Sequence, residues 1–185
     1  MNKKILWITE TAVMLAVLVT LQALTKPMGQ LVTGSCVNTV LAVAALVGGL
    51  ASGLTIALIS PILAFLLGIA PQILTVPAIM VGNAVFVTLL SLLADKNGKK
   101  VVRQVIAWLS AAFAKFVVLY LIVVKVICGV MAESLMSAGT LKAPMLKALP
   151  VTFSWSQLIT ALIGGAVALL IVPVVRKALG KQGAK

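Results

Sequence analysis

Residues 27–94 read PMGQLVTGSCVNTVLAVAALVGGLASGLTIALISPILAFLLGIAPQILTVPAIMVGNAVFVTLLSLLA and contain no Asp, Glu, Lys, Arg or His over 68 positions. Buried helices of water-soluble proteins are much shorter, so this stretch must be solvated by lipid. A hydrocarbon core about 30 Å thick is crossed by roughly 20 helical residues. The stretch therefore has room for three membrane crossings and the tight connections between them.

The composition of the whole chain agrees with this interpretation. Its 185 residues are 62% hydrophobic, with a mean hydropathy of +1.23, which indicates an integral membrane protein. The net charge of +12 comes from 15 Lys and Arg residues against three acids. Because these bases flank apolar segments, they are typical of topology signals and anionic-lipid contacts, and we expect no nucleic-acid binding.

Glycines, prolines and charges divide the chain into six apolar segments. We predict an all-α integral membrane protein, with a single six-helix domain over residues 1–185 and spans at 6–24, 35–50, 54–69, 73–93, 102–127 and 155–175. Spans two and three are short and are separated only by the Gly49–Gly53 region. Pro61 is expected to kink the third span, because proline removes a backbone donor.

The distribution of basic residues predicts the orientation, since short positive loops stay in the cytoplasm. One side of the membrane would carry ten bases, namely Lys3, Lys4, Lys96, Lys99, Lys100, Arg103, Arg176, Lys177, Lys181 and Lys185. The other side would carry only Lys26, Lys142 and Lys147. Both termini are thus predicted to be cytoplasmic, with residues 180–185 as a basic, mobile tail. Three connections would then face outward: Thr25–Gly34, Gly68–Gln72 and Cys128–Ser154.

Uncharged polar residues gather near the first two outward connections. Gln30, Thr33 and Asn38 lie at the mouth of the second span, and Gln72 lies in the next outward turn. These side chains are candidates for a ligand pocket; the alternative is that Ser35 caps the helix while Gln30 and Thr33 only contact water. Buried amides need partners, so Asn38 and also Asn83, near mid-bilayer, contact either another helix or a ligand.

Lys115 lies near the centre of the fifth span, where a charge costs roughly 2.5–3.5 kcal/mol on insertion scales. It either extends to the cytoplasmic surface or faces a polar cavity and meets an anionic or carbonyl-bearing ligand. Lys125, near the outer end of that span, is expected at the membrane interface. Trp155 opens the sixth span and is either a membrane-interface anchor or a stacking platform for a planar ligand.

The residue types needed for catalysis are scarce. The chain has no His, and its only acids are Glu10, Asp95 and Glu133, so we expect neither an enzyme nor a metal or cofactor site. Cys36 and Cys128 have no motif spacing; we interpret them as small apolar residues, with a bridge between them left open.

Ala12 and Ala16 place two small side chains on one face of the first span, four residues apart. Such a face lets another helix approach closely.

Taken together, these features resemble the substrate-binding S components of energy-coupling factor (ECF) transporters, which import vitamins and related micronutrients into bacteria and archaea. The resemblance rests on six spans, cytoplasmic ends, the Ala12/Ala16 face, a polar first outward loop and a Gly/Pro-rich run from Ala45 to Gly82. It implies a multi-pass protein of a prokaryotic plasma membrane that binds its vitamin from outside and topples against a coupling module. It also implies three partners, a transmembrane coupling subunit and two ATPase subunits, with Ala12 and Ala16 at the coupling-subunit interface.

The resemblance further implies a substrate pocket, for which loop position and polarity suggest Gln30, Thr33, Asn38, Gln72, Asn83, Lys115 and Trp155, with Cys128–Ser154 as part of a lid. The substrate stays open among pantothenate, folate, niacin and cobalamin. A six-helix structural or assembly protein without a transport role is the alternative function.

Overall fold

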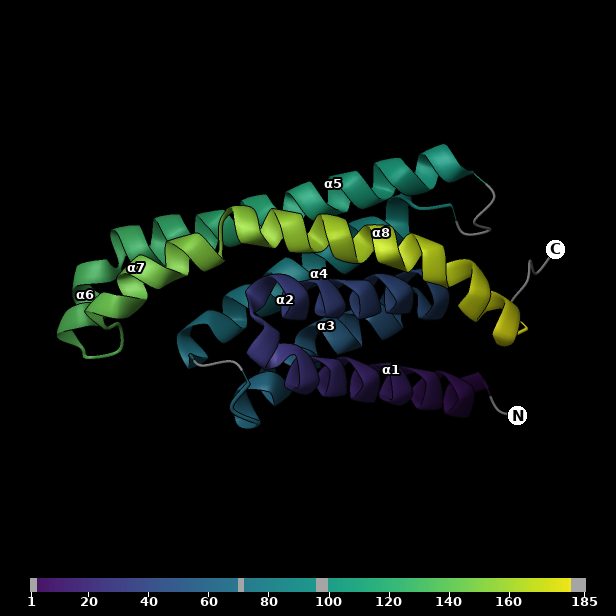
Figure 1. The fold of residues 1–185 in the computed structure, drawn as a ribbon, viewed down its shortest axis with the longest axis horizontal. Coiled ribbons are helices and arrows are strands. Elements are labelled where there is room, and N and C mark those ends of the chain that lie inside the picture. Colours follow the sequence, from purple (N-terminus) through teal and green to yellow (C-terminus); the bar gives the residue numbers. More distant parts are fainter. Residues whose placement is uncertain (1–2, 70–71, 96–99, 181–185) are drawn as a thin grey trace.

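The computed structural model describes residues 3–69, 72–95 and 100–180, and every regular element within these ranges is helical (Figure 1). The predicted all-α class is confirmed. Predictions that fall on Lys96, Lys99 and the tail 181–185 lie outside the described residues.

The elements follow one another with short connections. The long helices are α1 (Lys3–Thr25), α2 (Gln30–Val43), α3 (Gly49–Leu66), α4 (Val76–Leu93), α5 (Val101–Leu119) and α8 (Trp155–Ala178). The shorter elements are the 3-10 helices η1 (Lys26–Met28) and η3 (Ile73–Thr75), the π-helices η2 (Ala44–Gly48) and η4 (Tyr120–Val130), and the helices α6 (Ala132–Ser137) and α7 (Ala143–Thr152).

Five helical runs in the described ranges are long and apolar enough to cross a membrane. They are Lys4–Met28, Gln30–Leu66, Ile73–Leu93, Val101–Val130 and Ala143–Ala178. Runs of this kind support a multi-pass membrane protein, as the hydropathy predicts.

The run Gln30–Leu66 is not one straight helix, because the chain reverses at Gly49. Gly49 has φ +84°, a backbone conformation that side-chain-bearing residues rarely adopt. A Cβ added to Gly53 would lie 3.2 Å from the Cα of Ala45, whereas eight residues of continuous helix would separate them by about 12 Å. Helices α2 and α3 therefore form a hairpin.

This hairpin shifts two predicted boundaries. Helix α2 begins at Gln30 instead of residue 35, because the turn is made earlier, at Gly29 with φ +89°. The second reversal occurs at Gly48–Gly49, at the start of the region predicted for it, so α3 begins at Gly49 instead of residue 54. Helix α3 continues through Pro61, which is buried.

The segment Cys128–Ser154 differs most from its prediction as a flap-like outer loop. Helical backbone continues to Val130, and α6 and α7 occupy most of the remaining residues. A cluster of buried apolar side chains, which includes Leu141, Leu149 and Phe153, packs α7 against η4 and α4. The apolar residues of this segment thus contribute to a small core of their own.

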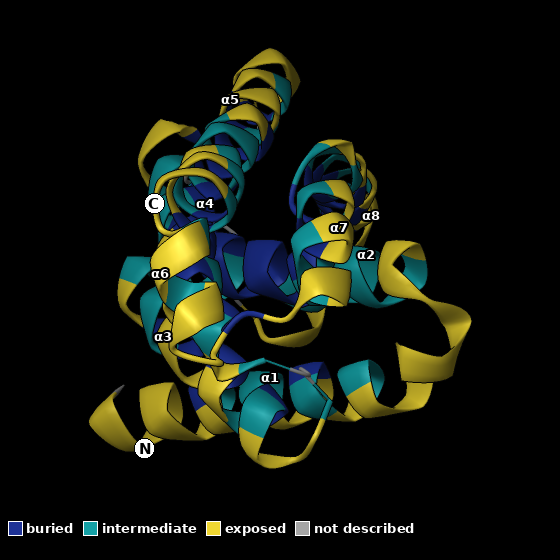
Figure 2. Ribbon diagram, turned by 90° about the vertical axis from the view of Figure 1, so that its left-hand side faces the viewer, coloured by how far each residue is buried: buried dark blue, intermediate teal, exposed yellow. Residues whose placement is uncertain are grey.

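The helices pack around α2 and α8, whose buried faces consist largely of small residues. A Cβ on Gly34 would lie 2.9 Å from Thr160 Cγ2, and one on Gly164 would lie 2.6 Å from both Asn38 Cβ and the Ser35 carbonyl oxygen. Figure 2 shows the buried residues gathered between the helices and the exposed ones on the outside. Small residues let these two helices approach closely.

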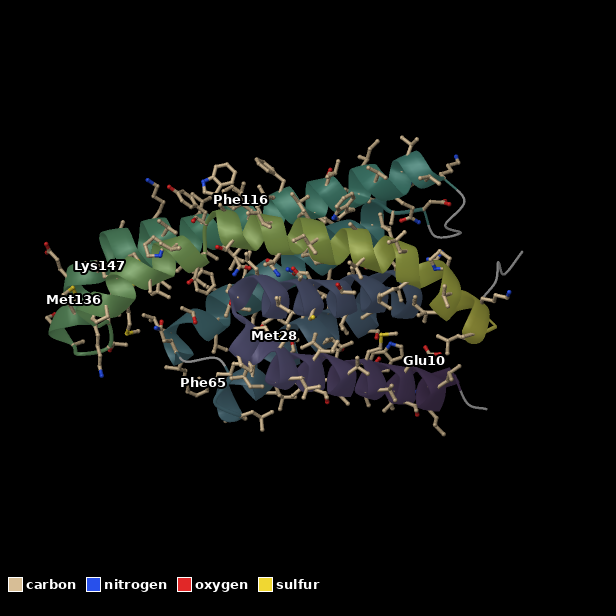
Figure 3. All side chains as sticks on the ribbon, in the orientation of Figure 1. Glu10, Met28, Phe65, Phe116, Met136 and Lys147 are labelled. Atoms are coloured by element: carbon tan, nitrogen blue, oxygen red, sulfur yellow. The ribbon has the colours of Figure 1, made fainter. Side chains whose placement is uncertain are left out.

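Helix α1 lies at the edge of the bundle, and only 11% of its most apolar window is buried (Figure 2). Thr11 and Ser52 join it to α3 through hydroxyl groups 2.9 Å apart. Ala12 and Ala16 are exposed on its outer surface. The start of α1 and the end of α8 lie at the same end of the molecule as Glu10, opposite Met136 and Lys147 (Figures 1 and 3).

The contact between α2 and α8 gives a testable prediction about stability. Gly164→Ala is expected to destabilise the protein by roughly 1–3 kcal/mol, because the new methyl group meets backbone atoms that cannot rotate away. Thermal unfolding in detergent measures the loss. Gly129→Ala is the matched control, since its Cβ would meet nothing closer than 3.6 Å. Equal melting temperatures for the two variants would contradict the packing described here.

Candidate functional site

A cavity of about 340 Å³ lies among α1, α2, α4, α5, α7 and α8. Its wall contains six of the seven residues predicted for a pocket: Gln30, Thr33, Asn38, Gln72, Asn83 and Lys115. These residues come from four separate parts of the sequence, and the fold brings them together around one space.

Lys115 forms the charged centre of the cavity wall. Its side chain is 3% exposed, and Nζ donates hydrogen bonds to Asn38 Oδ1 at 2.6 Å and to Asn83 Oδ1 at 2.7 Å. Nζ also lies 5.5 Å from the centre of the Phe86 ring, a distance at which the ring face attracts a cation. The side chain therefore faces the interior and does not extend to the cytoplasmic surface.

The two amides join three helices through this ammonium group, since Asn38 belongs to α2, Asn83 to α4 and Lys115 to α5. No acidic side chain is among the residues that line the cavity. An ammonium group has three donors, and two of them are used by the amides. One donor remains for a further acceptor.

A chain of hydrogen bonds continues from Asn38 into α8. Asn38 Nδ2 donates to Thr160 Oγ1 at 3.3 Å, and that hydroxyl donates to the Gln157 carbonyl at 3.1 Å. Gln157 Nε2 in turn donates to the Thr152 carbonyl at the end of α7, at 3.3 Å. Asn38 thus has the role of interhelical contact that was one alternative for it, and it also lines the cavity.

Three buried polar atoms belong to residues of the cavity wall and have no hydrogen-bond partner in the part of the chain that the structure describes: Gln22 Oε1, Gln72 Oε1 and Asn83 Nδ2. All three are buried, and buried polar atoms of folded proteins are almost always hydrogen-bonded. Each such atom costs about 1–3 kcal/mol if it stays unpaired. A ligand with complementary groups would satisfy them.

Several wall residues are not among the seven predicted, namely Gln22, Thr75, Leu149, Thr152, Phe153 and Gln157. Leu149, Thr152 and Phe153 belong to the segment Cys128–Ser154, which was predicted as part of a lid. For α8 a signal existed in the sequence, because Gln157 and Thr160 lie three residues apart and so share one helical face. Gln22 gave a weaker signal as a lone amide near the outer end of an apolar helix.

Trp155 does not join the other candidates. Its side chain is 67% exposed and stacks on Phe116, with ring centres 5.6 Å apart and an angle of 24° between the rings. Phe116 projects from the outer side of α5 (Figure 3). Since residues of a helix are about 100° apart, Trp155 lies about 200° around α8 from Gln157 and points away from the cavity side. Contact between Trp155 and a ligand is not supported.

Three further expectations can be compared with the structure. Ser35 does not cap a helix, because it lies inside α2 and its hydroxyl donates to the Leu31 carbonyl at 2.7 Å. Lys125 is exposed and lies 5.7 Å from the Tyr120 ring centre, as expected for an interfacial side chain. Cys36 and Cys128 are both free thiols.

The shared ammonium group predicts coupled stability effects. Asn83→Leu is expected to lower the free energy of unfolding by roughly 1–3 kcal/mol, because it removes an acceptor from a buried charge. Lys115→Met removes the charge together with its donors and should cost less, or stabilise the ligand-free protein. Denaturant unfolding in detergent of both single variants and the double variant measures the coupling. If the loss of unfolding free energy in the double variant equals the sum of the two single losses, the coupling between Asn83 and Lys115 is contradicted.

Comparison with known proteins agrees with the sequence-based expectation. Residues 7–176 match the family model described as ECF transporter, substrate-specific component. The comparisons with curated proteins and with solved structures return no significant match. The family match covers most of the 185 residues, including every described residue that lines the cavity. The chain therefore belongs to the substrate-specific components of ECF transporters.

Proposed function

We propose that this protein captures a vitamin or related micronutrient from outside the cell and delivers it by toppling against an ATP-driven coupling module. Members of the family are substrate-binding transport subunits without catalytic activity of their own. The observation that carries the proposal is the cavity around Lys115, with three buried polar atoms that lack partners. Gln30, Thr33, Asn38, Gln72, Asn83 and Lys115 are the proposed substrate-binding residues.

The same cavity favours transport over a purely structural role. In a protein whose polar residues only join helices, each buried polar atom would be expected to pair with a neighbouring helix. Here Asn83 uses its oxygen for Lys115 while its Nδ2 has no partner at the cavity wall. An amide whose oxygen is hydrogen-bonded and whose nitrogen has no partner suits a site that binds a ligand.

We further propose six crossings and cytoplasmic termini in a prokaryotic plasma membrane. The α2–α3 hairpin supports two crossings for the run Gln30–Leu66, since the parts on either side of Gly49 contain 19 and 18 residues. Each part is about 27–29 Å long, close to the thickness of the hydrocarbon core. The end of the molecule with both termini is the end that the basic residues predict to be cytoplasmic (Figure 1).

The outer surface of α1 is the proposed docking face for the transmembrane coupling subunit, which would work with two ATPase subunits. Ala12 and Ala16 are exposed there, and small side chains permit close helix contacts in a membrane. The position of α1 at the edge of the bundle leaves this face accessible (Figure 2).

Removal of one unpartnered amide should weaken ligand binding. Gln72→Leu is expected to reduce the amount of small molecule retained by the purified protein about tenfold or more, because the amide oxygen in the cavity is lost. Mass spectrometry of the molecules released on denaturation measures retention. Gln104→Leu is the matched control, since Gln104 also has an unpartnered oxygen but does not line the cavity. Equal retention by both variants would count against the cavity as the binding site.

A bulky side chain on the docking face should separate binding from transport. Ala16→Trp is expected to abolish co-purification with the coupling module and uptake into cells, because it prevents close approach on α1. Ligand retention should stay unchanged, since Ala16 does not line the cavity.

Leu170→Trp serves as the control for this experiment, because Leu170 is 78% exposed on α8, away from α1. Normal uptake by Ala16→Trp, or an equal loss in both variants, would argue against the proposed docking face.

A further inference from the structure

We propose that the ligand of this cavity is a small monocarboxylate whose carboxylate group binds Lys115 Nζ and Asn83 Nδ2 together. This inference rests on the proposed function and adds the chemical class of the substrate.

The charge of the cavity wall is the first argument. Among the described residues that line the cavity, Lys115 is the only charged side chain and none is acidic. A buried charge that is not neutralised is costly even when hydrogen-bonded, and two amide oxygens supply only partial negative charge. An anionic ligand completes the ion pair, whereas a cationic or ammonium-bearing ligand would find a like charge and no acid to bind.

The arrangement of donors is the second argument. The ammonium lies 2.7 Å from Asn83 Oδ1, and the unpartnered Nδ2 belongs to the same amide. The free ammonium donor and this N–H donor are therefore neighbours in the wall. A carboxylate has two oxygens and can accept from both. The primary amide of the same acid has only one oxygen and would turn an NH₂ group toward one of these donors.

The single cation of the wall distinguishes a carboxylate from a phosphate. A phosphate monoester carries a charge of about −1.5 to −2 and three acceptor oxygens, and its sites use several cations or backbone N–H groups. Among the described residues that line this cavity, Lys115 is the one cation, and Asn83 Nδ2 is the one buried donor atom without a partner. The remaining unpartnered atoms, Gln22 Oε1 and Gln72 Oε1, are acceptors and favour hydroxyl or N–H groups on the uncharged part of the ligand.

The volume limits the size of the ligand. A cavity of about 340 Å³ lies at the small end of the range of ligand pockets, which is about 300–1,000 Å³. This size favours a small ligand over a corrinoid macrocycle. A pteridine with a glutamate tail is disfavoured because it carries two carboxylates.

Matched pairs of compounds test the inference on the purified protein in detergent. The pairs are nicotinate with nicotinamide, pantothenate with pantothenol, and biotin with biotinamide, with cobalamin added as the bulky probe. Isothermal titration calorimetry is expected to find an acid that binds roughly 10- to 100-fold more tightly than its neutral counterpart, as expected for a charged hydrogen bond. A neutral member that binds as tightly as its acid, or binding of cobalamin, would overturn the inference.

Two lysine variants test the role assigned to Lys115. Lys115→Met should bring the affinity ratio of acid to neutral compound close to one, a readout that loss of active protein does not change. Lys125→Met, in the same helical run but outside the cavity, should leave the ratio as in the wild type. A ratio that survives Lys115→Met would contradict carboxylate binding by this side chain.

Mass spectrometry of the molecule retained by the purified protein identifies ligands that are not among the compounds tested by calorimetry. Formation of one methyl ester in acidic methanol supports the inference, whereas a retained molecule without a carboxylate overturns it and leaves the proposed function intact. If no compound of the panel binds and nothing is retained, the proposed function itself fails and the inference fails with it.

Discussion

A lysine ammonium group buried inside a protein that is itself solvated by lipid is the constraint around which the middle of this structure is arranged. A charge at that depth is tolerated only where the surrounding helices supply polar groups, because neither the bilayer nor an apolar core can solvate it. Asn38 and Asn83 supply those groups from two other helices. These hydrogen bonds fix the mutual position of α2, α4 and α5. They also place at the cavity wall a cation and an amide, Asn83, whose nitrogen has no partner.

The glycines make this arrangement sterically possible. Asn38 can reach Lys115 because α2 lies directly on α8, and this requires Gly34 opposite Thr160 and Gly164 opposite Asn38. Gly82, next to Asn83, leaves room for Leu119 of α5 in the same way. The hydrophobic effect cannot drive such contacts between helices in lipid, so close packing and hydrogen bonds carry the association. These glycines therefore shape the cavity wall, and Gly34 lines it directly.

The sequence was sufficient to predict the helical membrane class, the family and six residues of the cavity wall, for one physical reason. In a stretch without charges, each amide stands out against an apolar background, so Asn38, Gln72 and Asn83 could be selected by polarity alone.

The limits of prediction from the sequence also have physical reasons. Hydropathy does not locate a reversal within apolar sequence, so the start of α3 at Gly49 depended on a positive φ that composition cannot show. The apolar residues of 128–154 fit a loop or a small core equally well, and only the packing of Leu149 and Phe153 distinguishes these cases. Trp155 was selected by residue type, without the helical phase that turns it outward.

Helix α1 has a further consequence, because one continuous helix carries both Gln22 at the cavity wall and the exposed residues Ala12 and Ala16. Six residues, or about 9 Å along the axis, separate Gln22 from Ala16. A helix this short moves as a unit, so a ligand that repositions Gln22 also repositions the alanine face. Thermodynamic linkage then acts in both directions: if occupancy of the cavity changes the affinity of a partner for that face, the partner changes the affinity for the ligand by the same factor. Helix α1 alone would thus be enough to make release of the ligand depend on whether a partner is bound to the Ala12 and Ala16 face.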